Sequence, residues 1–175
     1  MAAYNFAETM RCIEKYGTSD PYTLLEKMKV NFKLTYAYPE NGLKGYCTIM
    51  NRSMYVRVNG KLNDMDQKIS AAHEGGHLIF HQRVVLRSPM SVLKSYELYS
   101  IKNRYESETN FFVADFLISD ADVMLIILED PDIDYFKIAN ILNVPSPLLN
   151  FKLYSMMRRG LPVKNPEPLD SRFLK

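Results

Sequence analysis

The sequence is poor in cysteine, in net charge and in long apolar runs. Its 175 residues include two cysteines, Cys12 and Cys47, which are too few for a disulfide framework. The formal net charge is only +2, so the composition indicates no strong electrostatic attraction to nucleic acid or to a membrane surface. The longest apolar run, residues 123–128, is far shorter than the roughly 20 residues that cross a bilayer. These shortages argue against a disulfide scaffold, a polybasic nucleic-acid binder and a membrane-spanning protein.

Signals for export and for repetition are missing as well. Residues 1–8 lack the apolar centre of a signal peptide, and the chain shows no internal repeat or low-complexity stretch. Its length suits one domain that buries about 70% of the surface of the unfolded chain. We therefore expect a single domain over residues 1–175, working in the cytoplasm.

Histidine is also scarce, and its placement is informative. The three histidines of the chain are His73, His77 and His81, and the first two belong to an H-E-x-x-H pattern that contains Glu74. Residues four apart share a helix face, so His73 and His77 can occupy two corners of a zinc tetrahedron. Glu74 follows the first ligand and can act as a general base toward a water, as in metallopeptidases.

The residues around this pattern predict a buried helix over about residues 64–81. Asn63 or Asp64 is the expected N-cap, and the flanking apolar residues recur at helical spacing. Gly75 and Gly76 are unusual inside a helix, because each costs about 0.5–1 kcal/mol relative to alanine. Two adjacent glycines indicate a place where another group approaches the helix backbone closely.

The third zinc ligand has to come from elsewhere in the chain. His81 lies eight residues after His73, about 12 Å along a helix axis at 1.5 Å per residue, which is too far for a shared ion. The cysteines have no other metal-site residues nearby. A second helix over about residues 102–118 places Glu106 on a core-directed face, where a carboxylate is costly unless it is paired or metal-bound. Glu106 is therefore the first choice, and Glu108, on the other side of that helix, stays open as the alternative.

These residues together resemble a known family. The pattern within residues 71–81, followed by Glu106-x-x-x-Asn110-x-Phe112, looks like the ImmA/IrrE family of metallopeptidases. The resemblance covers roughly residues 18–157. The departures from the family pattern affect packing positions and leave every ligand in place: Gly75, Thr109, Val113, and Ser119-Asp120 where a proline is usual.

The resemblance implies a function and a site. His73, His77 and Glu106 match the family's metal ligands for one zinc ion, and Glu74 matches its catalytic glutamate. The implied activity is that of a gluzincin-like endopeptidase carried by a phage or mobile element. Its substrate would be one specific protein, a helix-turn-helix repressor of the same element. The alternative is a metal-stabilised regulator that binds and masks a transcription factor without cleaving it.

The expected architecture is α+β. A mainly helical, zincin-like core over residues 1–118 contains a small antiparallel sheet of about three strands. Residues 120–157 form a helical C-terminal part that ends in a helix-turn-helix-like pair, and residues 158–175 form a tail. A hairpin over residues 46–58 is a candidate for the edge strand that pairs with an extended substrate. The last helix offers mostly apolar residues besides Asn150 and Lys152, so we expect it to pack rather than to read DNA.

Overall fold

The computed structural model describes residues 6–88, 92–101 and 103–164. The fold class is α+β and mainly helical, as predicted. The first half contains α1 (Phe6–Tyr16), α2 (Pro21–Lys27), β1 (Asn31–Thr35), β2 (Gly45–Met50), β3 (Ser53–Asn59) and α3 (Asp64–Phe80). The second half contains α4 (Gln82–Arg87), β4 (Val92–Ser95), α5 (Arg104–Leu117), α6 (Asp120–Glu129), α7 (Tyr135–Ile141) and α8 (Ser146–Arg158). The part of the predicted tail after residue 164 lies outside the described residues.

The sheet is larger than predicted and is mixed. Its order is β1-β3-β2-β4, in which β2 runs antiparallel to both β3 and β4 while β1 runs parallel to β3. The prediction of about three antiparallel strands therefore missed β4 and the parallel pair. β4 has only four residues, which is too short for a clear alternation, and strand direction depends on contacts between distant segments.

The hairpin of β2 and β3 forms where the sequence predicts it. Asn51 and Arg52 adopt positive φ values of 50° and 64°, as a tight two-residue turn between twisted strands requires. Both strands of this hairpin lie inside the sheet, because β1 covers one side and β4 the other. The hypothesis that the hairpin supplies an edge strand for substrate is therefore wrong, since the edges belong to β1 and β4.

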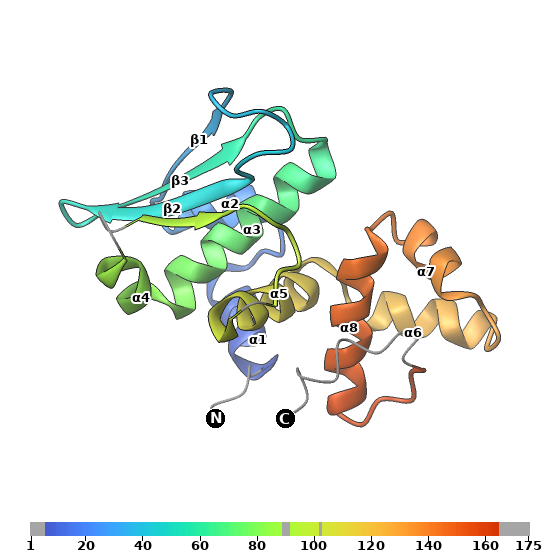
Figure 1. The fold of residues 1–175 in the computed structure, drawn as a ribbon. Helices are drawn as coiled ribbons and strands as arrows, with labels where there is room; N and C mark the ends of the chain where they lie inside the picture. Colours follow the sequence, from blue (N-terminus) through green and yellow to red (C-terminus); the bar gives the residue numbers. More distant parts are fainter. Residues whose placement is uncertain (1–5, 89–91, 102, 165–175) are drawn as a thin grey trace.

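Helix α3 packs against the sheet on one side and against α5 on another (Figure 1). Asn63 caps it by accepting a hydrogen bond from the backbone N–H of Asp66 at 2.8 Å. Every residue from 69 to 78 is buried, because apolar side chains contact the helix from two sides. One cluster, which includes Val56, joins α3 to the sheet, and a second, which includes Phe112, joins it to α5 and α8. A polar residue on α3 is thus removed from water unless a specific opening reaches it.

The C-terminal helix pair, α7 and α8, packs into the core that contains α5 (Figure 1). Every residue of α8 from 148 to 156 is buried. The two polar side chains that could have faced a nucleic acid, Asn150 and Lys152, are 8% and 1% exposed. Lys152 instead donates to Asp115 at 2.8 Å, which ties α8 to α5. Among the described residues, no helix is long and apolar enough to cross a membrane.

Candidate metal centre

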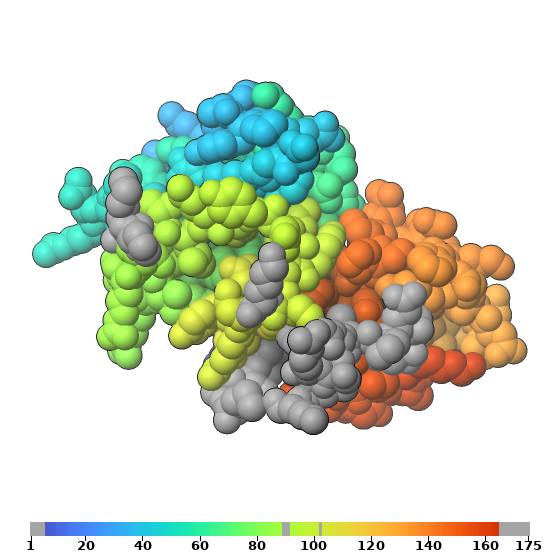
Figure 2. Space-filling view, viewed as in Figure 1, coloured from blue at the N-terminus to red at the C-terminus, as the bar shows by residue number. Residues whose placement is uncertain are grey.

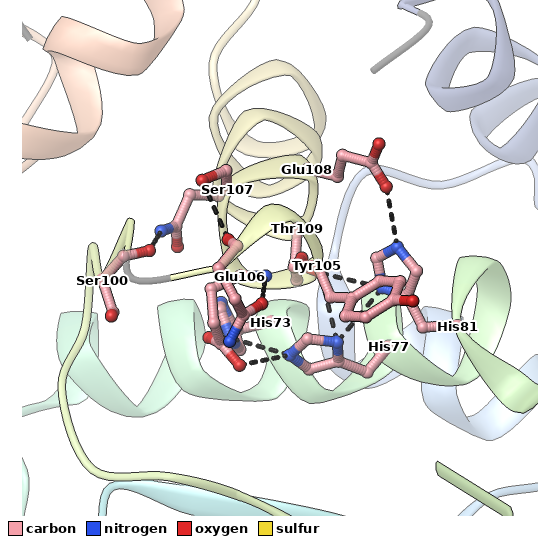
Figure 3. Close-up of polar contacts among 11 residues, drawn as sticks. His73, His77, His81, Ser100, Tyr105, Glu106, Ser107, Glu108 and Thr109 are labelled. Carbon is pink, nitrogen blue, oxygen red and sulfur yellow. Dashed lines mark hydrogen bonds and ion pairs between the residues drawn. The ribbon is translucent and has the colours of Figure 1, made fainter. Parts of the chain in front are cut away.

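Two helices bring the predicted ligands together. In α3, His73 and His77 are one turn apart and are 2% and 0% exposed. In α5, Asn103 is the N-cap and accepts from the backbone N–H of Glu106 at 3.0 Å, which places Glu106 in the first turn of the helix. This first turn faces α3, so the Glu106 carboxylate reaches both imidazoles (Figure 3).

The close approach of these helices depends on a glycine. A Cβ added at Gly76 would lie 2.8 Å from Cδ1 of Phe112 and 3.0 Å from Cγ2 of Thr109, both on α5. At Gly75 the nearest atom would be a methyl carbon of Leu25 at 3.3 Å, on α2. The paired glycines therefore give room to side chains of two neighbouring helices, which accounts for their presence inside α3.

The ligand atoms form a triangle of the size that zinc requires. Nε2 of His73 lies 3.0 Å from Nε2 of His77 and 3.0 Å from Oε2 of Glu106. Nε2 of His77 lies 3.5 Å from Oε1 of Glu106. Two tetrahedral bonds of about 2.0–2.1 Å place their ligand atoms about 3.3 Å apart. The three residues form the one cluster of histidine, cysteine and carboxylate groups within the described segments whose geometry could hold a metal ion.

The charges in this cluster also suit a cation. Burial lowers the pKa of His77 to about 4, so this imidazole is neutral near pH 7 and can offer a lone pair. Burial opposes charge on Glu106 too, but the close contacts of its carboxylate with His73 and His77 hold the pKa of this carboxyl well below the usual range. Burial would lower the pKa of His73, yet Glu106, Glu74 and Asn110 together raise it. A divalent cation would replace the proton that His73 and Glu106 otherwise share.

Glu74 is buried beside this cluster. It is 0% exposed, and neither carboxylate oxygen makes a hydrogen bond of normal geometry within the described part of the chain. Burial raises the pKa of Glu74 to about 7, against the opposing influence of His73 and of the nearby Ser95 and Cys47 side chains. A Cβ on Gly45 would lie 3.1 Å from Oε1 of Glu74, so the carboxylate packs against β2. An unpaired buried carboxylate is costly, and its presence fits a site built around a cation and water.

Glu108, the alternative ligand, lies away from the cluster. Its Oε2 is 3.1 Å from Nε2 of His81, and its Oε1 accepts from Nε of Arg104 at 2.6 Å. His81 lies on the far side of His77 from Glu106, as the helix geometry predicts (Figure 3). Burial lowers the pKa of His81, in spite of the opposing effect of Glu108. Asn110 donates to the carbonyl of Ser100 at 2.7 Å, and its side chain helps to raise the pKa of His73.

No motif in the sequence indicates the surface that leads to the cluster. A cavity of about 190 Å³ opens beside Glu106 and is lined by β4 and the segment that follows it, including Ser95, Tyr96 and Ser100. Figure 2 shows this segment, in yellow-green, at the surface of the molecule. These residues carry no motif, and their place beside Glu106 depends on the pairing of β4 with β2. Cys47, also on β2, lies close enough to Glu74 for each group to affect the pKa of the other.

Comparison with known proteins gives one informative relative. Over 152 residues the chain is 28% identical to a protein called "Uncharacterized immunity region protein 2" from Bacillus phage phi105. The alignment covers 87% of this chain and 90% of that protein, so the similarity extends over nearly the whole of both. No protein-family model matches the chain, and no solved structure matches it. The chain is thus similar to a phage immunity-region protein, and its buried His73, His77 and Glu106 form a group able to hold a metal ion.

Proposed function

We propose that this protein is a zinc-dependent endopeptidase that cleaves one specific protein. The observation that carries the proposal is the buried trio His73, His77 and Glu106, with the unpaired carboxylate of Glu74 beside it. Two imidazoles and a carboxylate leave a fourth position open, which is the ligand set of catalytic rather than structural zinc sites. A purely structural site has no need of a second carboxylate that is buried without a hydrogen-bond partner.

Each side chain of the site has a separate role in the proposed hydrolysis of an amide bond. A bound zinc ion would supply Lewis acidity, which polarises the substrate carbonyl and lowers the pKa of water toward 7. Glu74, whose own pKa is about 7, takes the proton from the attacking water and passes it to the leaving amine. Glu106 holds its negative charge throughout, because the pKa of its carboxyl stays well below the usual range. The low dielectric around these groups strengthens each interaction.

The free edge of β4 is the proposed docking place for the peptide. β4 is an outer strand of the sheet, and Ser95 lies both at its end and in the wall of the cavity beside Glu106. An extended peptide that adds to this edge would gain main-chain hydrogen bonds and pass next to the metal centre. Tyr96, which lines the same cavity, is a candidate donor to the developing oxyanion.

The relative indicates the biological setting. Similarity to an immunity-region protein of a phage supports a role in the regulation of lysogeny. A helix-turn-helix repressor of the same phage or mobile element is therefore the proposed substrate, and the reaction takes place in the cytoplasm where such a repressor acts. Asn150 and Lys152 are buried in α8, which supports a protein partner rather than direct contact with DNA.

The test uses purified, zinc-loaded protein and the helix-turn-helix repressor encoded by the same element. Wild type should cut the repressor into two fragments seen by mass spectrometry, while Glu74→Gln should bind one zinc and cut nothing. Glu129→Gln, an exposed change on α6, is the matched control and should behave as wild type. If both wild type and Glu74→Gln inactivate the repressor without cutting it, hydrolysis is excluded and the protein acts by masking the repressor.

A further inference from the structure

The second ring nitrogen of His77 faces a group that the proposed chemistry does not use. Nδ1 of His77 lies 3.2 Å from Nδ1 of His81, and both nitrogens lie 3.3 Å from Oγ1 of Thr109. These atoms are buried, so water does not compete for their hydrogen bonds. The position of the proton between the two imidazoles, on Nδ1 of His77 or on Nδ1 of His81, decides which nitrogen of His77 carries the lone pair.

The chain of contacts continues from His81 to the protein surface. Nε2 of His81 lies 3.1 Å from Oε2 of Glu108, and Nε of Arg104 donates to Oε1 of the same carboxylate. Exposure of the side chains rises along this path, from 0% at His77 to 5%, 20% and 50% at His81, Glu108 and Arg104. Figure 3 shows His81 and Glu108 on the opposite side of His77 from Glu106.

The donors and acceptors along the path fit together in one way when His81 is neutral. An ionised carboxylate only accepts, so Nε2 of His81 carries the proton and donates to Glu108. Nδ1 of His81 is then an acceptor, and Nδ1 of His77 has to be the donor. The hydroxyl of Thr109 donates to the carbonyl of Tyr105 at 2.8 Å, so its oxygen is a second acceptor for the same His77 proton. In the other tautomer of His77, two lone pairs would face each other across 3.2 Å.

We propose that His81 and Glu108 form a relay that holds His77 in its Nδ1–H tautomer and aims its Nε2 lone pair at His73 and Glu106. Metal-binding histidines usually donate their other ring proton directly to a carboxylate or a carbonyl group. Here the carboxylate acts through a second imidazole, one helical turn further along α3. His81 and Glu108 are positioning residues, since neither touches the metal-binding atoms. The inference rests on the metal site of the proposed function.

The same spacing explains why α3 carries three histidines. His73, His77 and His81 follow one another at intervals of four residues, so their rings line one helix face. From α5, Glu106 meets the first two rings and Glu108 meets the third. The two glutamates therefore complete one continuous polar layer between the helices, with the ligand at one end and the relay at the other.

The test measures zinc affinity by chelator competition and the His77 tautomer by ¹⁵N NMR of the imidazole nitrogens. His81→Ala and Glu108→Ala should each weaken zinc binding by about 10–100-fold, the usual effect of removing such a partner. The double variant should be little weaker than either single one, because both act through the same proton. The His77 nitrogens of Glu108→Ala should also move toward the shifts of mixed tautomers, which a merely structural change would not cause.

Glu108→Ala is the relay variant that should disturb folding least, because Glu108 lies at the outer, more exposed end of the relay. Glu129→Ala on α6 is the control for the loss of an exposed carboxylate elsewhere in the protein. Zinc affinities of both relay variants within twofold of wild type would overturn the relay and leave the metal site standing. A loss of zinc affinity in Thr109→Val, with none in His81→Ala or Glu108→Ala, would also overturn the relay, because the acceptor of the His77 proton would then be the hydroxyl oxygen of Thr109. Failure of the wild type to bind zinc would overturn the proposed function and the relay together.

Discussion

Replacing Gly76 by alanine should destabilise the protein, although alanine is the better helix former. The new methyl group would lie 2.8 Å from Cδ1 of Phe112, whose side chain is 0% exposed and has no room to rotate away. Overpacking of this kind costs about 1–3 kcal/mol, whereas relief of the glycine penalty returns about 0.5–1 kcal/mol. We expect a net loss of about 1 kcal/mol in the free energy of unfolding.

Gly75→Ala is the matched comparison, because it makes the same chemical change one residue earlier. Its methyl would meet one methyl group of Leu25 at 3.3 Å, which a shift of a few tenths of an ångström relieves. Its stability should therefore stay near wild type or rise slightly, so that the two variants differ by about 1–3 kcal/mol. Urea denaturation in the presence of a chelator measures this difference without a contribution from bound metal.

A second measurement links the packing to the site. Displacement of Phe112 and Thr109 would move α5 and with it the Glu106 carboxylate, so Gly76→Ala should also weaken zinc binding while Gly75→Ala should not. Equal stabilities for the two variants, or a Gly76→Ala protein more stable than wild type, would refute the claim that α5 packs directly against the backbone of α3.

Further predictions concern the charged groups that join α5, α6 and α8. Lys152→Met should lower the free energy of unfolding by about 3 kcal/mol, the lower end of the cost of breaking a buried ion pair, because Arg159 stays 3.8 Å from the Asp115 carboxylate as a second cation. Thermal melting would show this loss, and an unchanged midpoint would contradict it. Burial favours the neutral form of Asp120, but hydrogen bonds from Arg159 and Lys152 outweigh it and lower the pKa of this carboxyl from 3.8 to about 2. Because the pKa of Asp120 is lower in the folded protein than in the unfolded chain, its ion pairs stabilise the fold fully above pH 3.8. This stabilisation is lost as the pH falls toward 2. The stability difference between wild type and Asp120→Asn, followed by urea denaturation, should shrink over that range; a constant difference would count against the pairing.

Local rules sufficed for much of the fold. The cap at Asn63 and the turn at Asn51 and Arg52 depend on residues within a few positions of one another, and the structure has both where the sequence predicts them. The placement of His73 beside His77 is equally local, because a helix brings residues four apart onto one face. Such features are readable from one sequence because no distant segment is needed to form them.

Contacts between distant segments decided the rest. The sequence left Glu106 and Glu108 as alternatives, and the packing of α5 on α3 directs the first to His73 and the second to His81. The sequence assigned no role to His81, since the carboxylate and the hydroxyl that it contacts, those of Glu108 and Thr109, come from another helix. It also predicted the wrong edge strand, because the position of β4 depends on pairing across more than forty residues. Spacing along the chain thus determined which residues could bind a metal. Tertiary packing decided that the Glu106 carboxylate meets His73 and His77 and that the Glu108 carboxylate meets the ring of His81.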